Sequence, residues 1–315
     1  MSVMDTLYQQ LKNYGHVRAN VLMSKYTTFR IGGSVRFLVE VSETEKFVGL
    51  LNFLSGEGVE YFVLGGGSNL LWKDEEYDGV VIKILNTKFF VQNTQIIADA
   101  GVPLALIVNA ATQNSLTGME WAAGIPGTVG AAVRGNAGAY GQDTAQDLEK
   151  VEVWRSGQVV ELKKEDCGFG YRESGFKNNG DIILRAHFKL AAGDRVEILK
   201  KTQGYIAERV GKFPHFPSAG CFFKNISLDK FPGNKSQLPE KFVKVGKVGA
   251  AWLIETAGLK GYTVGGAKIS DEHANFLVNF NGATQADVLT IFEKVKEEVY
   301  NKYGVELEPE VEIVK

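Results

Sequence analysis

The stretch GIPGTVGAAVRGNAGAYG, residues 124–141, decides how the rest of this sequence is interpreted. With Gly118 just ahead of it, seven glycines fall between residues 118 and 141, interleaved with Ala, Thr and Asn. A segment with so few bulky side chains offers bare backbone, whose N–H groups can approach a flat or anionic ligand closely. Tight loops between strands are the structural alternative. The density of glycine, with Asn136 and Tyr140 as polar residues among them, favours a cofactor site.

The composition is that of a globular protein with more than one domain. A chain of 315 residues is long for one compact core, and its 44% hydrophobic and 23% charged residues are ordinary. The net charge of −2 gives no electrostatic reason to expect nucleic acid or an anionic membrane as a partner. No apolar run approaches the ~20 residues of a membrane span, and the N-terminal segment lacks a signal-peptide pattern. We therefore expect a cytoplasmic protein without a membrane partner.

The cysteines and histidines indicate neither a disulfide framework nor a metal centre. Two cysteines, Cys167 and Cys221, are most simply free thiols in a reducing compartment. The four histidines are scattered, without the spacing of metal ligands. We expect no metal site.

A second glycine cluster follows an apolar run at residues 61–64. The loop reads GGGSNL from Gly65 to Leu70, and strand, helix, strand, glycine-rich loop is how α/β proteins present a diphosphate site. The loop is not a P-loop, because Gly-Lys-Ser/Thr is missing, and Leu70 replaces the third glycine of the Rossmann pattern. An anion-binding loop and a plain β-turn fit the loop equally well.

Hydrophobic periodicity and capping residues predict the remaining elements. Ser42 with Glu45, and Thr284 with Asp287, have the spacing of capping boxes. The expected helices cover roughly 4–14, 45–56, 103–110, 194–209, 250–256 and 285–303. The expected strands cover 35–41, 61–64, 79–84, 151–154, 159–162, 182–184, 273–279 and the alternating tail 305–314. Residues 156–157 are expected to form a hairpin turn, and 231–241 a surface loop.

Seven segments, in order along nearly the whole chain, resemble the UDP-N-acetylenolpyruvoylglucosamine reductases, flavoenzymes of bacterial cell-wall precursor synthesis. They are YTTFRIGG, LGGGSNLL, GIPGTVGAAVRGNAGAYG, FGYRESGFK, SAGCFFKN, AAWLIETAGLKG and LEPEV. The short interval from Arg172 to Cys221 resembles the shorter, type II subclass.

The resemblance implies an α+β fold of three domains, with an FAD-binding unit of the vanillyl-alcohol-oxidase type. We expect the first FAD-binding domain over 1–85, with 304–315 packed on it, and the second over 86–212. The substrate-binding domain is expected over 213–303.

The resemblance also implies the reaction. NADPH reduces a non-covalent FAD, and hydride then passes from flavin N5 to the vinyl carbon of UDP-N-acetylglucosamine enolpyruvate. Protonation of the resulting enolate gives UDP-N-acetylmuramate. The implied partners are the nucleotide-sugar and NADPH, and we expect a monomer.

Three residues correspond to catalytic positions of the family. Arg172 matches the arginine that stabilises the enolate, and Glu310 in LEPEV matches the assisting carboxylate. Cys221 stands where the family usually has the proton-donating serine. A thiol, with an unperturbed pKa of about 8.5, is a stronger acid than an aliphatic hydroxyl and can serve as the donor. A small buried cysteine is the structural alternative.

The remaining site residues come from the same resemblance. The FAD-binding candidates are Arg30, Ile31, Gly65, Gly66, Gly67, Ser68, Asn69, Gly127, Thr128, Gly130, Gly135, Asn136 and Gly138. The substrate-binding candidates are Lys212, Asn225 and His273.

Two other functions stay open on the sequence. An FAD oxidase of the same cofactor-fold superfamily would explain both glycine clusters but neither SAGCFFKN nor LEPEV. A nucleotide-sugar binding protein without catalysis would be consistent with the change from serine to Cys221, although Arg172 and Glu310 speak against it.

Overall fold

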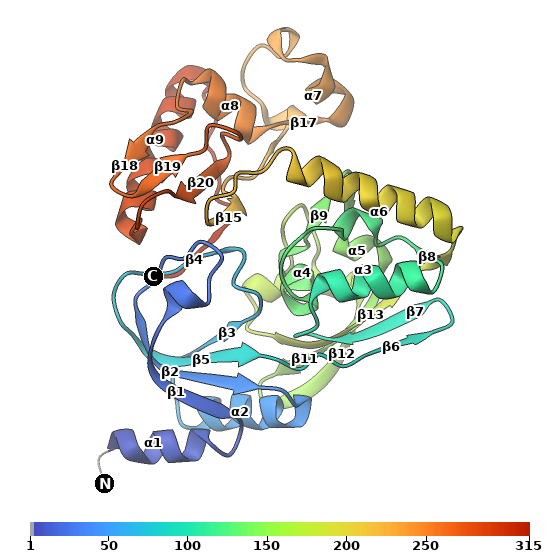
Figure 1. The fold of residues 1–315 in the computed structure, drawn as a ribbon, viewed down its shortest axis with the longest axis vertical. Helices are drawn as coiled ribbons and strands as arrows, with labels where there is room; N and C mark the ends of the chain where they lie inside the picture. Colours follow the sequence, from blue (N-terminus) through green and yellow to red (C-terminus); the bar gives the residue numbers. More distant parts are fainter. Residues whose placement is uncertain (1–2) are drawn as a thin grey trace. The chain divides into compact units, whose positions relative to one another are not determined.

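The computed structural model describes residues 3–315 and shows a mixed α/β chain that divides into two compact units (Figure 1). Unit 1 contains the described residues up to Val21, together with Val35–Gly66 and Asp78–Gly211. Unit 2 contains Leu22–Ser34, Gly67–Tyr77 and Lys212–Lys315. The division into three domains at residues 85 and 212 stays a prediction.

The first sheet of unit 1 has four strands in the order β1-β2-β5-β3. They are β1 (His16–Leu22), β2 (Ser34–Val41), β5 (Tyr77–Ile84) and β3 (Tyr61–Leu64), and β3 runs parallel to β5. Short α1 (Val3–Leu11) precedes this sheet. Helix α2 (Thr44–Gly56) follows β2 with Glu43 as its N-cap, and no side chain caps it. The predicted Ser42–Glu45 capping box is therefore wrong, because the helix begins one residue later than that spacing requires.

The second sheet of unit 1 is five-stranded and antiparallel, in the order β12-β11-β13-β7-β6. Its strands are β6 (Phe89–Gln92), β7 (Gln95–Asp99), β11 (Leu148–Arg155), β12 (Gln158–Lys163) and β13 (Ile182–Lys189). Ser156 and Gly157 join β11 to β12 with φ of 47° and 90°, the left-handed geometry of a type I′ hairpin turn. The predicted hairpin is confirmed.

Helices cover one face of this five-stranded sheet (Figure 1). They include α3 (Leu104–Gln113) and α4 (Val129–Gly135), with α6 (Arg195–Val210) packed against α3 and one-turn α5 (Thr144–Asp147) against α4. Trp121, Val129 and Phe188 are fully buried in the shared core. Two short strand pairs, β9 (Gly138–Ala139) with β10 (Gln142–Asp143) and β8 (Leu116–Thr117) with β14 (Ala191–Ala192), complete unit 1.

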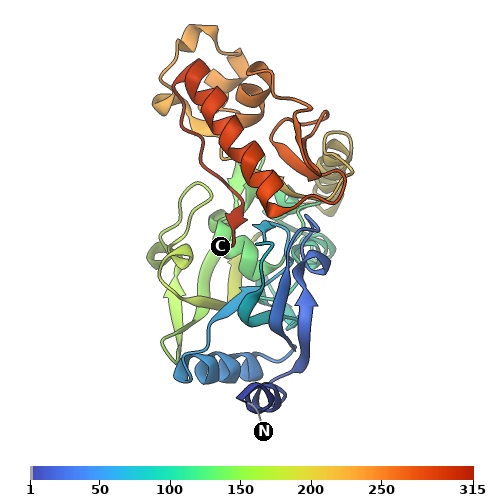
Figure 2. The same ribbon diagram turned by 90° about the vertical axis from the view of Figure 1, so that its left-hand side faces the viewer.

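Unit 2 is built on a four-stranded antiparallel sheet in the order β15-β20-β19-β18. Its strands are β15 (Ser218–Cys221), β18 (Thr263–Val264), β19 (Ala267–Ile269) and β20 (Phe276–Asn279). The long helix α9 (Gln285–Tyr303) packs along β18 and β19 and is the red helix at the front of Figure 2. Its predicted capping box, with Thr284 and Asp287, is confirmed, and Gly304 ends it with φ of 67°.

The rest of unit 2 combines short elements around a core of Phe222, Phe223 and Phe292. They are β4 (Leu70–Leu71) parallel to β21 (Glu312–Ile313), β16 (Ile226–Ser227) with β17 (Lys247–Val248), α7 (Glu240–Val245) and α8 (Ala250–Thr256). The predicted surface loop 231–241 is wrong in part, because Phe231 and Leu238 are buried in this core and α7 starts at Glu240. None of the helices described between Val3 and Lys315 has the length and apolar character needed to span a membrane.

Candidate active site

The glycine-rich stretch of unit 1 contains a short helix that the sequence did not predict. Helix α4 begins after Thr128 and ends at Asn136, which has φ of 40°. The side chains of Val129 and Val133 are fully buried and anchor it. The N–H groups of Val129 and Gly130 donate to Val102 and Ala100 at 2.9 Å each. The segment is thus fixed to the end of β7.

Gly65 and Gly66 lie directly against this segment within unit 1. A Cβ atom on Gly66 would come within 2.7 Å of Gly127 Cα, and one on Gly65 within 2.6 Å of Thr128 Oγ1. Gly66 is therefore required by close backbone approach, and Gly65 leaves room for the Thr128 side chain. Thr128 is 7% exposed, and its Oγ1 is among the buried polar atoms of the described chain that have no hydrogen-bond partner. A buried hydroxyl without a partner beside bare backbone fits a polar, planar cofactor such as FAD.

Arg172 lies in a tight turn beside the same segment. Gly170 and Glu173 exchange backbone hydrogen bonds of 2.9 and 3.1 Å around the turn. Arg172 has φ of 57°, a left-handed conformation that L residues other than glycine adopt at a cost. Its guanidinium Nη2 donates to the Gly138 carbonyl at 2.8 Å. Unit 1 therefore brings the predicted catalytic arginine to the glycine-rich stretch.

Asn136, a predicted FAD-binding residue, has its side chain engaged within unit 1. It is buried, its Nδ2 donates to the Gly170 carbonyl at 2.8 Å, and its Oδ1 accepts from Ala145 N at 3.0 Å. Asn136 therefore links the end of α4 to the turn that carries Arg172.

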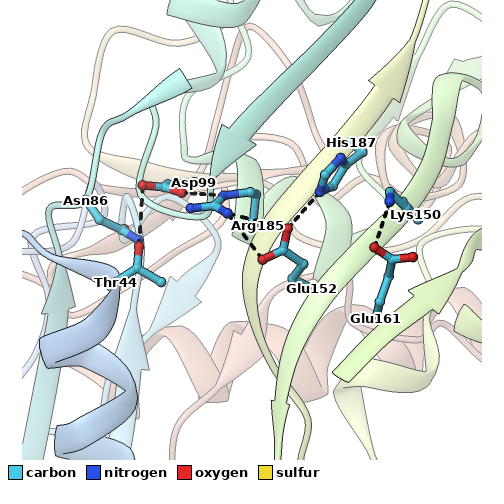
Figure 3. Close-up of polar contacts among 8 residues, drawn as sticks. All are labelled: Thr44, Asn86, Asp99, Lys150, Glu152, Glu161, Arg185 and His187. Atoms are coloured by element: carbon cyan, nitrogen blue, oxygen red, sulfur yellow. Dashed lines mark hydrogen bonds and ion pairs between the residues drawn. The ribbon is translucent and has the colours of Figure 1, made fainter. Parts of the chain in front are cut away.

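A row of charged residues supports the strand end that holds the glycine-rich stretch. Figure 3 shows Arg185 of β13 lying between Asp99 of β7 and Glu152 of β11. Its Nε bonds Asp99 at 2.9 Å and its Nη1 lies 3.3 Å from Glu152, whose other oxygen contacts His187 Nε2 at 2.9 Å. Asp99 ends β7, immediately before the Ala100 carbonyl to which Gly130 donates. The row ties the end of β7 to the middle of β13 and β11.

Asn86 extends this support. Its Oδ1 accepts from Gly101 N at 3.1 Å, and its Nδ2 donates to Thr44 Oγ1 at 3.1 Å (Figure 3). The residues that follow β7 are therefore held from two sides.

Within unit 2, Cys221 lies at the end of β15, after an irregular register. Ser218 pairs with Val278 and Cys221 pairs with Phe276, so β15 has one residue more than β20 over this interval. Gly220 has φ of 83° at the extra position. This is a β-bulge, a feature that re-aims the following side chain. Cys221 is partly exposed.

Glu310 is brought beside the Cys221 segment by backbone hydrogen bonds. Glu310 N donates to the Phe222 carbonyl at 2.8 Å, and Lys224 N donates to the Glu308 carbonyl at 2.9 Å. Asn69 Nδ2 donates to the Glu310 carbonyl at 3.1 Å. Unit 2 thus gathers two predicted catalytic residues and the end of the second glycine cluster.

Asn275 is a supporting residue that the sequence analysis missed. It is 3% exposed, and its carbonyl accepts from Phe222 N at 2.7 Å. Its Oδ1 accepts from Phe223 N at 2.9 Å, and its Nδ2 donates to the Phe223 carbonyl at 2.8 Å. A lone asparagine ahead of a strand carries no recognisable signal of such a clamp.

The segment with Arg30 and Ile31 also lies in unit 2, next to the second glycine cluster. Thr28 N donates to the Gly67 carbonyl at 3.0 Å, and Thr28 Oγ1 donates to the Ser218 carbonyl at 2.7 Å. Arg30 has φ of 55°. The side chain of Ile31 is buried in the unit 2 core, so only its backbone can face a ligand.

The three predicted substrate-binding residues have different environments in unit 2. Lys212 begins the last segment of the unit, Lys212–Lys315. Asn225 Oδ1 accepts from Ala250 N at 3.0 Å and so holds the start of α8. Burial lowers the pKa of His273, whose Nδ1 accepts from Asn275 N at 3.3 Å and whose ring is 6.0 Å from that of Phe213. The lowered pKa favours the neutral imidazole form of His273.

Two models of known protein families together match most of the chain. Residues 35–163 match the family model described as FAD binding domain. Residues 212–314 match the model described as UDP-N-acetylenolpyruvoylglucosamine reductase, C-terminal domain.

Curated relatives extend the match to full length. The chain is 39% identical over 315 residues to the UDP-N-acetylenolpyruvoylglucosamine reductase of Caldanaerobacter subterraneus, covering 99% of this chain and 98% of the relative. The corresponding protein of Clostridium novyi is 38% identical over 302 residues, covering 95% and 92%. The crystal structure of the same reductase from Thermus caldophilus is similar with a TM-score of 0.77 at 35% identity, covering 95% of this chain and 100% of that one.

Proposed function

Because the chain belongs to the UDP-N-acetylenolpyruvoylglucosamine reductase family, we propose that it reduces UDP-N-acetylglucosamine enolpyruvate to UDP-N-acetylmuramate, with FAD as cofactor and NADPH as reductant. The observation that carries the proposal is the identity of 39% across 99% of the chain. In this proposal the protein acts in peptidoglycan precursor synthesis, as a cytoplasmic monomer.

The cofactor is held by backbone and small side chains. In unit 1 these are Gly65, Gly66, Thr128 and the start of α4. FAD, when bound, takes two electrons from NADPH and passes a hydride to the vinyl carbon of the substrate. The unpartnered Thr128 hydroxyl and the close approach of Gly66 to Gly127 support this assignment.

Arg172 stabilises the negative charge that builds up toward the substrate carboxylate. Its turn is closed by two backbone hydrogen bonds, and its guanidinium is oriented by the Gly138 carbonyl. A hydrogen-bond donor that is held in place before the reaction needs little reorganisation when negative charge develops on the substrate. This is the basis of electrostatic stabilisation in enzymes. Glu310 assists at the same enolate.

Cys221 delivers the proton that completes the reduction. The bulge at Gly220 aims the thiol, and Asn275 clamps the two residues that follow it. The Lys224 ammonium, three residues further along the chain, pairs with Glu308 at 3.1 Å. Lys212, Asn225 and His273 bind the nucleotide-sugar.

The role of Cys221 is tested by substitution. Cys221→Ser retains most activity, since a hydroxyl can also deliver the proton, whereas Cys221→Ala lowers turnover by orders of magnitude. Reduction of the flavin by NADPH is unchanged in both variants. An alanine variant that turns over like wild type, with its flavin bound, contradicts this role.

The function as a whole is tested by an absorbance spectrum of the purified protein. A bound flavin that NADPH bleaches, and that the enolpyruvyl nucleotide-sugar recolours without oxygen, supports both half-reactions. Flavin that recolours only with oxygen favours the oxidase instead. Folded protein that binds no flavin contradicts the proposal.

A further inference from the structure

Lys83 lies at the point where the second glycine cluster begins. Strand β5 pairs in parallel with β3, and Lys83 is the register partner of Leu64, the last residue of β3. Its Nζ donates to the carbonyl of Gly65, the first residue of the cluster. All of these residues belong to unit 1.

This hydrogen bond determines which way the first peptide group of the cluster faces. In a planar trans peptide the carbonyl and the N–H point in opposite directions. Since the Gly65 carbonyl points to Lys83, the N–H of Gly66 points away from it. Gly66 packs against Gly127, where a Cβ would lie 2.7 Å from Gly127 Cα, so this peptide group has little freedom to turn.

Lys83 also contributes charge at this position. The side chain is only partly exposed, and burial lowers its pKa, with Glu40 acting in the opposite direction. The Glu40 carboxylate forms an ion pair with Arg18 at 3.2 Å. A desolvated ammonium next to a glycine-rich loop stabilises an anion more strongly than an exposed one.

We propose that Lys83 is a positioning residue for the diphosphate of FAD, which orients the Gly65–Gly66 peptide and adds positive charge behind it. The inference rests on the proposed function only in taking FAD as the cofactor. A lysine that merely stabilises the loop is the structural alternative, and the two differ in which part of the flavin they affect.

The test compares flavins with and without phosphate. Lys83→Met apoprotein is titrated with FAD and with riboflavin, following flavin fluorescence. We expect FAD to bind at least about tenfold more weakly than to wild type, in line with loss of a charged hydrogen bond, and riboflavin to bind within twofold of wild type. Lys83→Arg keeps the charge and stays close to wild type for FAD. Lys88→Met, at an exposed position of the same unit, is the matched control and leaves both affinities unchanged.

Three results overturn the inference. The first is that Lys83→Met binds FAD as tightly as wild type does. The second is that Lys83→Met loses affinity for FAD and riboflavin equally, which indicates a structural role. The third is that Lys83→Arg fails to retain FAD. Should Lys83→Met not fold, Lys83→Gln provides the same FAD and riboflavin comparison. Failure of the wild-type apoprotein to bind FAD is a different outcome, because it removes the proposed function itself.

Discussion

At Arg172 the backbone adopts a strained conformation, and this conformation positions the side chain. The residue has φ of 57° in a turn closed by Gly170 and Glu173, a conformation that favours glycine. We therefore expect Arg172→Gly to be more stable than Arg172→Ala by about 1 kcal/mol, although both lose the bond to Gly138. Urea denaturation measures the difference, and both variants should be inactive. An alanine variant as stable as the glycine variant contradicts the prediction that the backbone at residue 172 is strained.

Asp147 allows a second prediction at the scale of a single residue, on how thermal stability depends on pH. Burial raises the pKa of this carboxyl, and the nearby Glu120 and Asp143 raise it further. A raised pKa in the folded state means that the protonated form is stabilising and that this stability is lost as pH rises through the folded pKa.

Asp147→Asn should therefore melt at a higher temperature than wild type at pH 8, with the difference shrinking as pH falls toward the unfolded pKa of about 3.9. Melting curves across this range measure the effect. Asp229→Asn, at an exposed position of unit 2, is the matched control. A difference that stays constant with pH, or one of opposite sign, contradicts the prediction.

At the scale of elements, the sequence predicted best where a local signal decides the structure. The capping box of α9, the bounds of α8 and the turn at 156–157 depend on side chains within a few positions of one another. Helix α4 was missed because its glycines lower helix propensity, and the buried Val129 and Val133 stabilise it only after folding. The hairpin of β6 and β7 was missed because it has little alternation of its own and depends on pairing with β13.

The β15 bulge allows an element-scale prediction. Gly220 has φ of 83° with open space around its Cα, so Gly220→Ala meets strain rather than a clash. We expect a loss of about 1 kcal/mol in the free energy of unfolding, with slower protonation because the aim of Cys221 changes.

Gly204 provides a control in which the expected change in stability has the opposite sign. It lies within α6, also in open space, and no positive φ is involved, so Gly204→Ala should stabilise by about 0.5–1 kcal/mol and leave turnover unchanged. Chemical denaturation and the rate of flavin reoxidation by substrate measure both variants. A Gly220→Ala variant that matches Gly204→Ala in both readouts shows that the bulge is not required.

At the scale of the whole molecule, the site candidates came from the order of motifs along the chain rather than from any one of them. Patterns of residue type alone placed Glu310 in a predicted strand over 305–314 and gave no reason to choose it. That strand is wrong for most of its length, since the structure has only β21 at Glu312–Ile313. The supporting contacts of Asn275, Asn86 and Lys83 were out of reach, since each joins residues that are distant in sequence through pairings that only the fold creates.

Cofactor binding then has a consequence for global stability. A ligand that binds only the folded chain stabilises it by RT ln(1 + [L]/Kd), about 2.7 kcal/mol at a hundredfold excess over Kd. Added FAD should therefore raise the melting temperature of the apoprotein. In Gly66→Ala the new Cβ would lie 2.7 Å from the Gly127 backbone, so the two segments must separate and the cofactor should bind poorly. This variant should show little FAD-dependent rise, while Gly204→Ala should show the full wild-type rise. A full rise in Gly66→Ala would mean that the close approach of the two glycine clusters is not what holds the flavin.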